Sequence, residues 1–178
     1  MGSLHLIFGC MFSQKTTELL RQIRKYSSIG KKILVINYIH DTRYGHNAIF
    51  THDKDSTTAI CTDTLSSLQS IISSYDILVI DEGQFFRDIV PTVLQWVDTD
   101  HKDVFIASLL GDSDKQLFGN TYILLPHANT IQFLTAYCSI CKDGTPAPFT
   151  KCIQTKEHQI QIGGSDAYMP VCRTHYTT

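Results

Sequence analysis

The sequence lacks any long hydrophobic run, and it lacks an excess of either charge. Its apolar stretches are far shorter than the ~20 residues that span a bilayer, so we expect no membrane partner. Lys and Arg total 15 against 17 Asp and Glu, a net charge of −2. A nucleic-acid partner is not expected either, because phosphate backbones are bound through a basic surface. The first residues also lack the features of a signal peptide.

Cysteine is scarce, with 6 residues among 178, and neither internal repeats nor low-complexity tracts occur. The cysteine spacing suits a metal site better than a disulfide framework, which favours a reducing, cytoplasmic location. Hydrophobic residues make up 43% and charged residues 18% of the chain. This balance is typical of a packed globular protein.

Short apolar runs alternate with helical patterns along most of the chain. The runs are continuous and rich in Val and Ile, as in strands buried on both faces, and they cover residues 4–8, 32–38, 76–80 and 103–107. Helical periodicity covers residues 16–26, 67–75 and 88–97, and the first of these places Leu19, Leu20 and Ile23 on one face. The alternation predicts an α/β fold with a P-loop-type parallel sheet flanked by helices.

The character of the sequence changes near residue 134. Helical periodicity stops there, and Cys, Gly, Pro and His punctuate the remainder. A segment this short cannot bury enough core to fold alone, so it needs an additional cross-link to stabilise it. We therefore expect a nucleotide-binding α/β domain over residues 1–133 and a small zinc-binding subdomain over residues 134–178.

The stretch GCMFSQKTTE starts at Gly9, between the first apolar run and the first helical pattern. It fits the phosphate-loop pattern G-x-x-x-x-G-K-[ST] at Gly9, Lys15 and Thr16, but Gln14 stands at the second glycine. In such loops backbone N–H groups cradle phosphate, the lysine neutralises it and the hydroxyl reaches Mg²⁺. The interpretation is an ATP site made by Gly9, Cys10, Met11, Phe12, Ser13, Gln14, Lys15 and Thr16. The alternative is a tight turn with a surface lysine.

The stretch IDEGQFF (80–86) begins at the last residue of the apolar run 76–80, and an acidic pair follows that residue directly. A carboxylate at the carboxyl end of a strand, opposite a phosphate loop, is where such folds hold magnesium. Asp81 is the candidate for that role, and Glu82 could accept a proton from a hydroxyl nucleophile. A solvated acidic pair at a strand end is the alternative.

Two short pairs near the end of the chain carry metal-binding residues. Cys138-x-x-Cys141 is followed by Cys172-x-x-His175. Four such ligands close a tetrahedral zinc site with no open position, which makes the zinc structural. Two unrelated cysteine pairs are the alternative, but they leave the stability of this segment unexplained. The nearby stretch IGGSDAY (162–168) could wrap a flat ligand, with Tyr168 packing on it, although alone it would be a turn.

Taken in order, these features resemble the type II thymidine kinases, a family of small zinc-containing enzymes of animals, bacteria and large DNA viruses. The resemblance covers nearly the whole chain and rests on MFSxKxTELLRxIRKY, DTRYG with THDK, IDEGQFF, KQLFGN, LTAYCxxC, IQIGGxDxY and VCRxHY. IDEGQFF followed by the spaced cysteine pairs is its most specific part. The short length is similar to that of the poxvirus members.

The resemblance implies transfer of the γ-phosphoryl group of ATP to the 5′-hydroxyl of thymidine, with Mg²⁺ and structural zinc as cofactors and a homotetramer as the assembly. It implies that Glu82 is the general base, that Asp81 and Thr16 serve magnesium, and that Arg43 lies near the phosphates. The positions that it implies for the nucleoside pocket are Met11, Phe85, Leu109, Ser113, Phe118, Thr150 and Tyr168. A "lasso" loop of Gln159, Ile160, Gln161, Ile162 and Gly163 would hold the base through its backbone.

The departures from the family pattern lie at the site itself. Cys10 replaces a proline and Gln14 a glycine, and a side chain at position 14 could strain the loop or displace phosphate. The other changes are Leu110 for an acid, Ser113 for a pocket phenylalanine and Cys152 for an arginine.

Three hypotheses therefore stay open. The chain is a working thymidine kinase, a kinase-derived module that binds nucleotide or protein without catalysis, or a nucleoside kinase of altered specificity. The retained Glu82 favours an enzyme, because a binding module has no obvious use for a general base. The altered phosphate loop favours the binding module.

Overall fold

The four apolar runs of the sequence lie side by side as strands of one sheet. The computed structural model of the chain describes residues 1–40, 48–50, 56–155 and 163–177. All strand pairs of the main sheet are parallel, and their order is β5-β2-β6-β7-β1-β8. The bounds are β1 Ser3–Gly9, β2 Ile33–Tyr38, β5 Ile60–Thr62, β6 Ile77–Ile80, β7 Asp103–Ser108 and β8 Thr130–Leu134. The predicted α/β fold class is confirmed.

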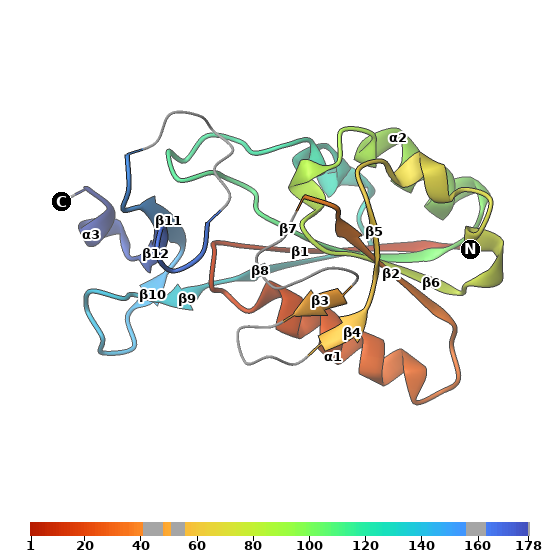
Figure 1. Ribbon diagram of the computed structural model, residues 1–178, viewed down its shortest axis with the longest axis horizontal. Helices are drawn as coiled ribbons and strands as arrows, with labels where there is room; N and C mark the ends of the chain where they lie inside the picture. The colour runs from red at the N-terminus through yellow and green to blue at the C-terminus, as the bar shows by residue number, and fades with distance from the viewer. Residues whose placement is uncertain (41–47, 51–55, 156–162, 178) are drawn as a thin grey trace.

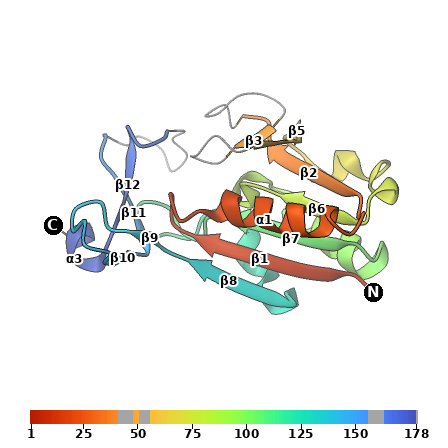
Figure 2. The same ribbon diagram turned by 90° about the horizontal axis from the view of Figure 1, so that it is seen from below.

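The sheet buries both of its faces. Along β1, Leu4 and Phe8 belong to one hydrophobic cluster and Ile7 to another, because alternate residues of a strand point to opposite faces. The first cluster is covered by α2 (Ile89–Leu94) and the second by α1 (Lys15–Ser27). Figures 1 and 2 show these two helices on opposite sides of the sheet.

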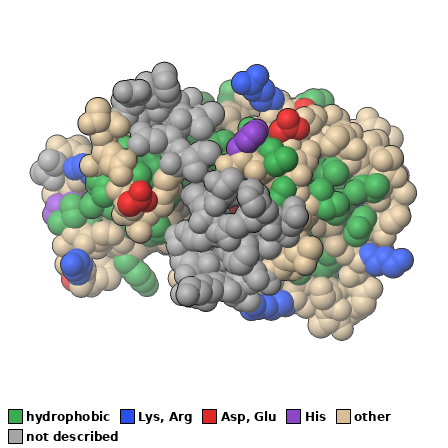
Figure 3. All heavy atoms as spheres, viewed as in Figure 1, with side chains coloured by type: hydrophobic (Ala, Val, Ile, Leu, Met, Phe, Trp, Pro, Cys, Tyr) green, Lys and Arg blue, Asp and Glu red, His purple; other side chains and the backbone are tan. Residues whose placement is uncertain are grey.

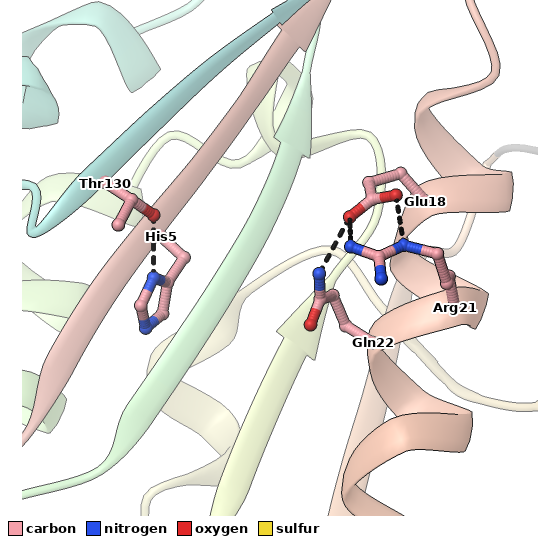
Figure 4. A network of polar contacts seen from close by, with 5 residues as sticks. All are labelled: His5, Glu18, Arg21, Gln22 and Thr130. Atoms are coloured by element: carbon pink, nitrogen blue, oxygen red, sulfur yellow. Dashed lines mark hydrogen bonds and ion pairs between the residues drawn. The ribbon is translucent and has the colours of Figure 1, made fainter.

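Helix α1 packs on the sheet through an apolar stripe and carries a network of polar contacts on its other side. Its buried residues are Leu19, Leu20 and Ile23, the three that the sequence places on one face. On the other side Glu18 accepts two hydrogen bonds of 2.7 Å from Arg21 and one of 2.7 Å from Gln22 (Figure 4). Exposed pairs of this kind contribute little to stability, so the stripe determines how the helix packs.

The prediction of a helix over residues 67–75 is wrong. The structure has two separate 3-10 turns there, η1 Leu65–Leu68 and η2 Ile72–Ser74. The segment is rich in serine, whose hydroxyl competes with helical hydrogen bonds. The Ser67 hydroxyl, for example, donates to the carbonyl of Thr64 at 2.7 Å.

The helix predicted over residues 88–97 forms as α2 and then continues as a π-helical turn, η4 Gln95–Thr99. Pro91 lies in the first turn, where no intrahelical N–H bond is lost. Trp96 in the π turn is fully buried, and its indole N–H donates to the side chain of Gln69 at 2.7 Å. This segment therefore anchors one face of the sheet.

Two strands of the main sheet have no apolar run in the sequence. β8 lies at the sheet edge and is mostly exposed, and β5 is only half-buried. β8 is joined to β1 by backbone pairing and by a contact of 2.7 Å between His5 Nδ1 and the Thr130 hydroxyl (Figure 4). An edge strand needs one apolar face at most, so it gives a weak sequence signal.

The last part of the chain forms a small module beyond the carboxyl ends of β1 and β8 (Figure 1). Its elements are β9 Ala136–Tyr137, β10 Pro146–Ala147, β11 Phe149–Cys152, β12 Tyr168–Val171 and α3 Arg173–Thr177. The remaining elements are a hairpin of β3 Ala48–Phe50 with β4 Ser56–Thr58, and the 3-10 turns η3 Gly83–Phe85 and η5 Thr121–His127. Because the module lies beyond the carboxyl ends of β1 and β8, it faces the edge of the sheet at which parallel-sheet proteins bind ligands.

On the face of the molecule that Figure 3 shows, the described Lys and Arg side chains lie apart from one another and form no patch. Among the residues that the structure describes, no helix is both long enough and apolar enough to cross a membrane.

Candidate active site

The loop between β1 and α1 folds back on itself. A Cβ at Gly9 would overlap the Ser13 hydroxyl and lie 2.7 Å from the carbonyl oxygen of Leu134, so only glycine fits there. The carbonyl of Cys10 accepts hydrogen bonds of 2.8 Å from the Ser13 hydroxyl and 2.8 Å from Lys15 Nζ. The loop is thus closed by its own side chains, with the Lys15 ammonium lying over it.

Gln14 has a backbone conformation that favours glycine, the residue of the family pattern at this position. It lies in the left-handed region at φ 64° and ψ 31°, directly before α1, and Phe12 also has a positive φ of 66°. Alternating right- and left-handed residues form anion-binding concavities of backbone N–H groups. The Gln14 side chain is exposed. A non-glycine residue in this conformation strains the loop.

Asp81 lies at the end of β6 and is joined to α1. Its carboxylate accepts a hydrogen bond of 2.8 Å from the Thr16 hydroxyl and one of 3.0 Å from the backbone N–H of Glu82. The pKa of Asp81 is raised to about 7, first by burial and then by the neighbouring Glu82 charge, against the opposing effect of the Thr16 hydrogen bond. A divalent cation bound at these oxygens would favour the ionised form, so the pair fits a magnesium ion.

Glu82 has a strained backbone. Its φ of 54° and ψ of 42° lie in the left-handed region, and it opens the 3-10 turn Gly83–Phe85. Its carboxylate accepts a hydrogen bond of 2.5 Å from the side-chain amide of Gln84. Such conformations in non-glycine residues concentrate at functional sites. The sequence did not single out Gln84.

The aromatic candidates for the nucleoside pocket are grouped. The rings of Phe85 and Phe118 meet edge to face with centroids 5.6 Å apart. Tyr38 at the end of β2 stacks on Phe85 at 5.1 Å, a contact that the sequence did not indicate. Leu109 lies at the end of β7, and its N–H donates to the side chain of Gln84 at 2.9 Å.

The phosphate loop is tied to the C-terminal module. The N–H of Met11 donates to the hydroxyl of Thr150 at 3.0 Å, and the thiol of Cys10 to the carbonyl of Ala147 at 3.1 Å. Cys10 thus replaces a proline with a side chain that makes a buried contact. Gly9, Cys10 and Thr150 also line a cavity of about 320 Å³ between the end of β1 and the module.

The two departures after β7 have different surroundings. Leu110 packs against the larger hydrophobic cluster, where the acid of the family pattern would lose hydration. Ser113 is buried, and its carbonyl accepts a hydrogen bond of 2.7 Å from the hydroxyl of Tyr176 in α3.

The other candidates of the base-binding loop are only partly described. Tyr168 is buried in β12, and Gly163 lies so close to Ala167 that a Cβ would be 2.6 Å from its side chain. Arg43, Gln159, Ile160, Gln161 and Ile162 lie outside the described residues.

The four predicted metal ligands lie together. Their ligand atoms, from Cys138, Cys141, Cys172 and His175, are all within 4.8 Å of one another. His175 Nδ1 is 3.5, 3.3 and 3.4 Å from the three sulfurs, and two of the sulfurs are 3.8 Å apart. A tetrahedral zinc ion with Zn–S bonds of about 2.3 Å needs ligand separations of about 3.8 Å. The donor set and its spacing fit zinc.

The loop at the end of β1, joined through Thr16 to a buried carboxylate at the end of β6, places the chain among the α/β proteins with a P-loop-type parallel sheet. The family model described as Thymidine kinase matches residues 2–176. The chain therefore belongs to the thymidine kinase family, as the sequence motifs predicted.

Similar proteins carry that name in distant organisms. The chain is 40% identical over 176 residues to a thymidine kinase of Rabbit fibroma virus, covering 98% of this chain and 96% of the relative. It is 38% identical over 181 residues to thymidine kinase 1 of Dictyostelium discoideum, covering 99% and 78%. It is 36% identical over 182 residues to thymidine kinase a of Arabidopsis thaliana, covering 99% and 76%.

Proposed function

We propose that the protein is a thymidine kinase, which transfers the γ-phosphoryl group of ATP to the 5′-hydroxyl of thymidine and so makes dTMP for nucleotide salvage. The observation that carries the proposal is the hydrogen bond of 2.8 Å between Thr16 and Asp81, which joins the phosphate loop to the carboxylate pair. Family membership supplies the substrate class. The left-handed conformation kept at Gln14 supports a competent loop.

The residues divide the work of phosphoryl transfer, which needs positioning and charge neutralisation more than covalent chemistry. The loop N–H groups and Lys15 bind the phosphates, and Arg43 adds positive charge. Thr16 and Asp81 would hold Mg²⁺, which would supply charge neutralisation for the phosphates when bound. The 5′-oxygen of thymidine attacks the γ-phosphorus, the bond to the ADP oxygen breaks, and the Glu82 carboxylate accepts the hydroxyl proton.

The nucleoside is held from several sides in this proposal. Met11, Phe85, Leu109, Ser113, Phe118, Thr150 and Tyr168 line its pocket, and the backbone of residues 159–163 binds the base. Zinc at the cysteine-histidine cluster is structural and keeps the base of that loop in place. Pre-ordering the loop lowers the entropy lost when the nucleoside binds.

We propose two units, residues 1–133 and 134–178. The buried residues of the two larger clusters all lie in the first unit. The third cluster is made by the second unit together with Cys10 and Phe12 of the phosphate loop. The loop would therefore be the joint between the units.

We propose a homotetramer and a cytoplasmic location. β8 offers one interface. Among the described strands it pairs only with β1, so its other edge is open, and Ile131 and Phe133 are exposed by 43% and 59%. A tetramer needs a second interface as well. None of the six cysteines forms a disulfide, which suits a reducing compartment. Light scattering coupled to gel filtration measures the assembly.

Ligand-induced stabilisation and a nucleoside panel test the proposed function. A ligand that binds the native state raises the melting temperature, so ATP with Mg²⁺ and thymidine should each stabilise the protein. Product formation should be fastest with thymidine. Faster turnover of deoxycytidine would support a kinase of altered specificity, and no stabilisation by either substrate would support a protein-binding derivative.

A further inference from the structure

Gln84 is a buried polar residue directly behind the proposed general base. It is 4% exposed and lies in the 3-10 turn that follows Glu82. Burying an amide is costly unless its donors and acceptors are paired. The hydrogen-bond partners of the Gln84 amide therefore indicate its role.

The orientation of the Gln84 amide is fixed by its neighbours. The N–H of Leu109 can only donate, and it lies 2.9 Å from Oε1, so that atom must be the acceptor oxygen. The Ser108 hydroxyl lies 3.1 Å from the same oxygen. Nε2 must then point to Glu82, whose Oε2 it reaches at 2.5 Å. An amide donor is thus directed at a carboxylate.

The same residue supports both ends of the segment 109–119, which follows β7. The side chain of Gln84 binds the segment where it starts, at Leu109. At the other end Gly119 has a φ of 64°, and a Cβ there would overlap the backbone carbonyl of Gln84. Ser108 extends the contact to the hydroxyl of Thr121 at 3.1 Å. Gln84 therefore contacts the segment at both of its ends.

We propose that Gln84 is a positioning residue that couples the nucleoside-binding segment 109–119 to the carboxylate of Glu82. The inference rests on the proposed function, in which that segment lines the pocket and Glu82 is the base. When the segment is seated, the amide holds the carboxylate in one orientation. Displacing a catalytic group by about 1 Å costs on the order of 10²-fold in rate.

Two substitutions at Gln84 separate this role from a purely structural one. Gln84→Met keeps the length of the side chain but loses both hydrogen-bonding ends. Gln84→Glu keeps an acceptor for Leu109 but puts a carboxylate against Glu82. We expect kcat to fall by about 10- to 100-fold in both, with KM for ATP unchanged. KM for thymidine should rise in Gln84→Met only, because Gln84→Glu still seats Leu109.

Gln69→Met is the control, because the Gln69 side chain also makes a hydrogen bond, to the buried Trp96, but lies outside the site. It should lower the melting temperature and leave kcat unchanged. If both Gln84 variants turn over like the wild type, the inference is overturned while the kinase assignment stands. If Gln84→Met does not fold, a wild-type kcat in Gln84→Glu overturns it alone. If the wild-type protein makes no dTMP, the proposed function is overturned and the inference falls with it.

Discussion

The hydroxyl of Tyr176 donates a hydrogen bond of 2.7 Å to the backbone carbonyl of Ser113. Tyr176 follows the metal-cluster residue His175 in α3, and Ser113 lies in the segment after β7. The ammonium of Lys115 adds a cation–π contact, 3.8 Å from the centre of the Tyr176 ring. The helix that carries a metal ligand is thus attached to the proposed nucleoside pocket.

Chelation should loosen the C-terminal module before the sheet. The module has only a small hydrophobic cluster, so it depends on the metal. The single tryptophan, Trp96, is buried against the sheet and reports on the first unit by fluorescence. We expect a chelator to open protease sites after residue 134 at concentrations that leave this fluorescence unchanged.

Cysteine substitutions provide the control for chelation. Cys172→Ser should reproduce the effect of the chelator, whereas Cys61→Ser, in β5 and outside the cluster, should not. A proteolysis pattern that is the same with and without metal would contradict a structural zinc site.

Tyr176→Phe should weaken thymidine binding and leave ATP binding alone. The change removes only the hydroxyl that holds Ser113, and one hydrogen bond contributes about 0.5–1.5 kcal/mol. KM for thymidine should therefore rise by about two- to tenfold. Tyr137→Phe is the control, since Tyr137 is 73% exposed on the same module. Equal KM values in both variants would show that the contact has no effect on the pocket.

Gln14→Gly should stabilise the protein. A left-handed conformation costs a non-glycine residue about 1–2 kcal/mol, and the extra chain entropy of glycine offsets about half of that. We expect the free energy of unfolding to rise by up to about 1 kcal/mol, and KM for ATP to change by less than about fivefold. Gln14→Ala keeps the Cβ and should give no gain. A larger fall in KM for ATP would show that the Gln14 side chain obstructs phosphate.

The free energy of unfolding should fall as the pH is lowered below about 6.5 because of His5. Burial lowers the pKa of His5 below its ordinary value, and the Asp103 carboxylate offsets part of that effect. The unfolded chain then binds the proton more readily than the folded one, so stability is complete above the unfolded pKa and is lost as the pH falls toward the folded pKa. Urea titrations at several pH values measure this loss.

The His5 ring contacts the Thr130 hydroxyl through Nδ1 (Figure 4) and the Ser3 hydroxyl through Nε2. It also stacks on Phe105 with centroids 4.3 Å apart. His5→Gln should flatten the pH dependence below about pH 6.5. His127→Gln, at an exposed position, should leave it as in the wild type. An unchanged slope in His5→Gln would assign the loss to other groups.

The sequence predicted the parts of the molecule that are locally encoded. Continuous apolar runs gave β1, β2, β6 and β7, and the short cysteine spacings gave the metal cluster. The sequence does not predict β8, because an exposed edge strand carries no such run. It wrongly predicts a helix over the serine-rich segment 67–75. Gln84 and Tyr38 were missed because their partners, Leu109 and Phe85, are distant in sequence and meet them only in the folded chain.

Transfer of labelled γ-phosphate from ATP to thymidine, by the zinc-replete wild-type protein and by Glu82→Gln, tests the central claim most directly. We expect the wild type to form labelled dTMP, and the variant to bind both substrates but lose kcat by about 10²- to 10⁴-fold, the contribution of a general base. No labelled dTMP from folded wild-type protein, or equal rates in the two proteins, would contradict the account.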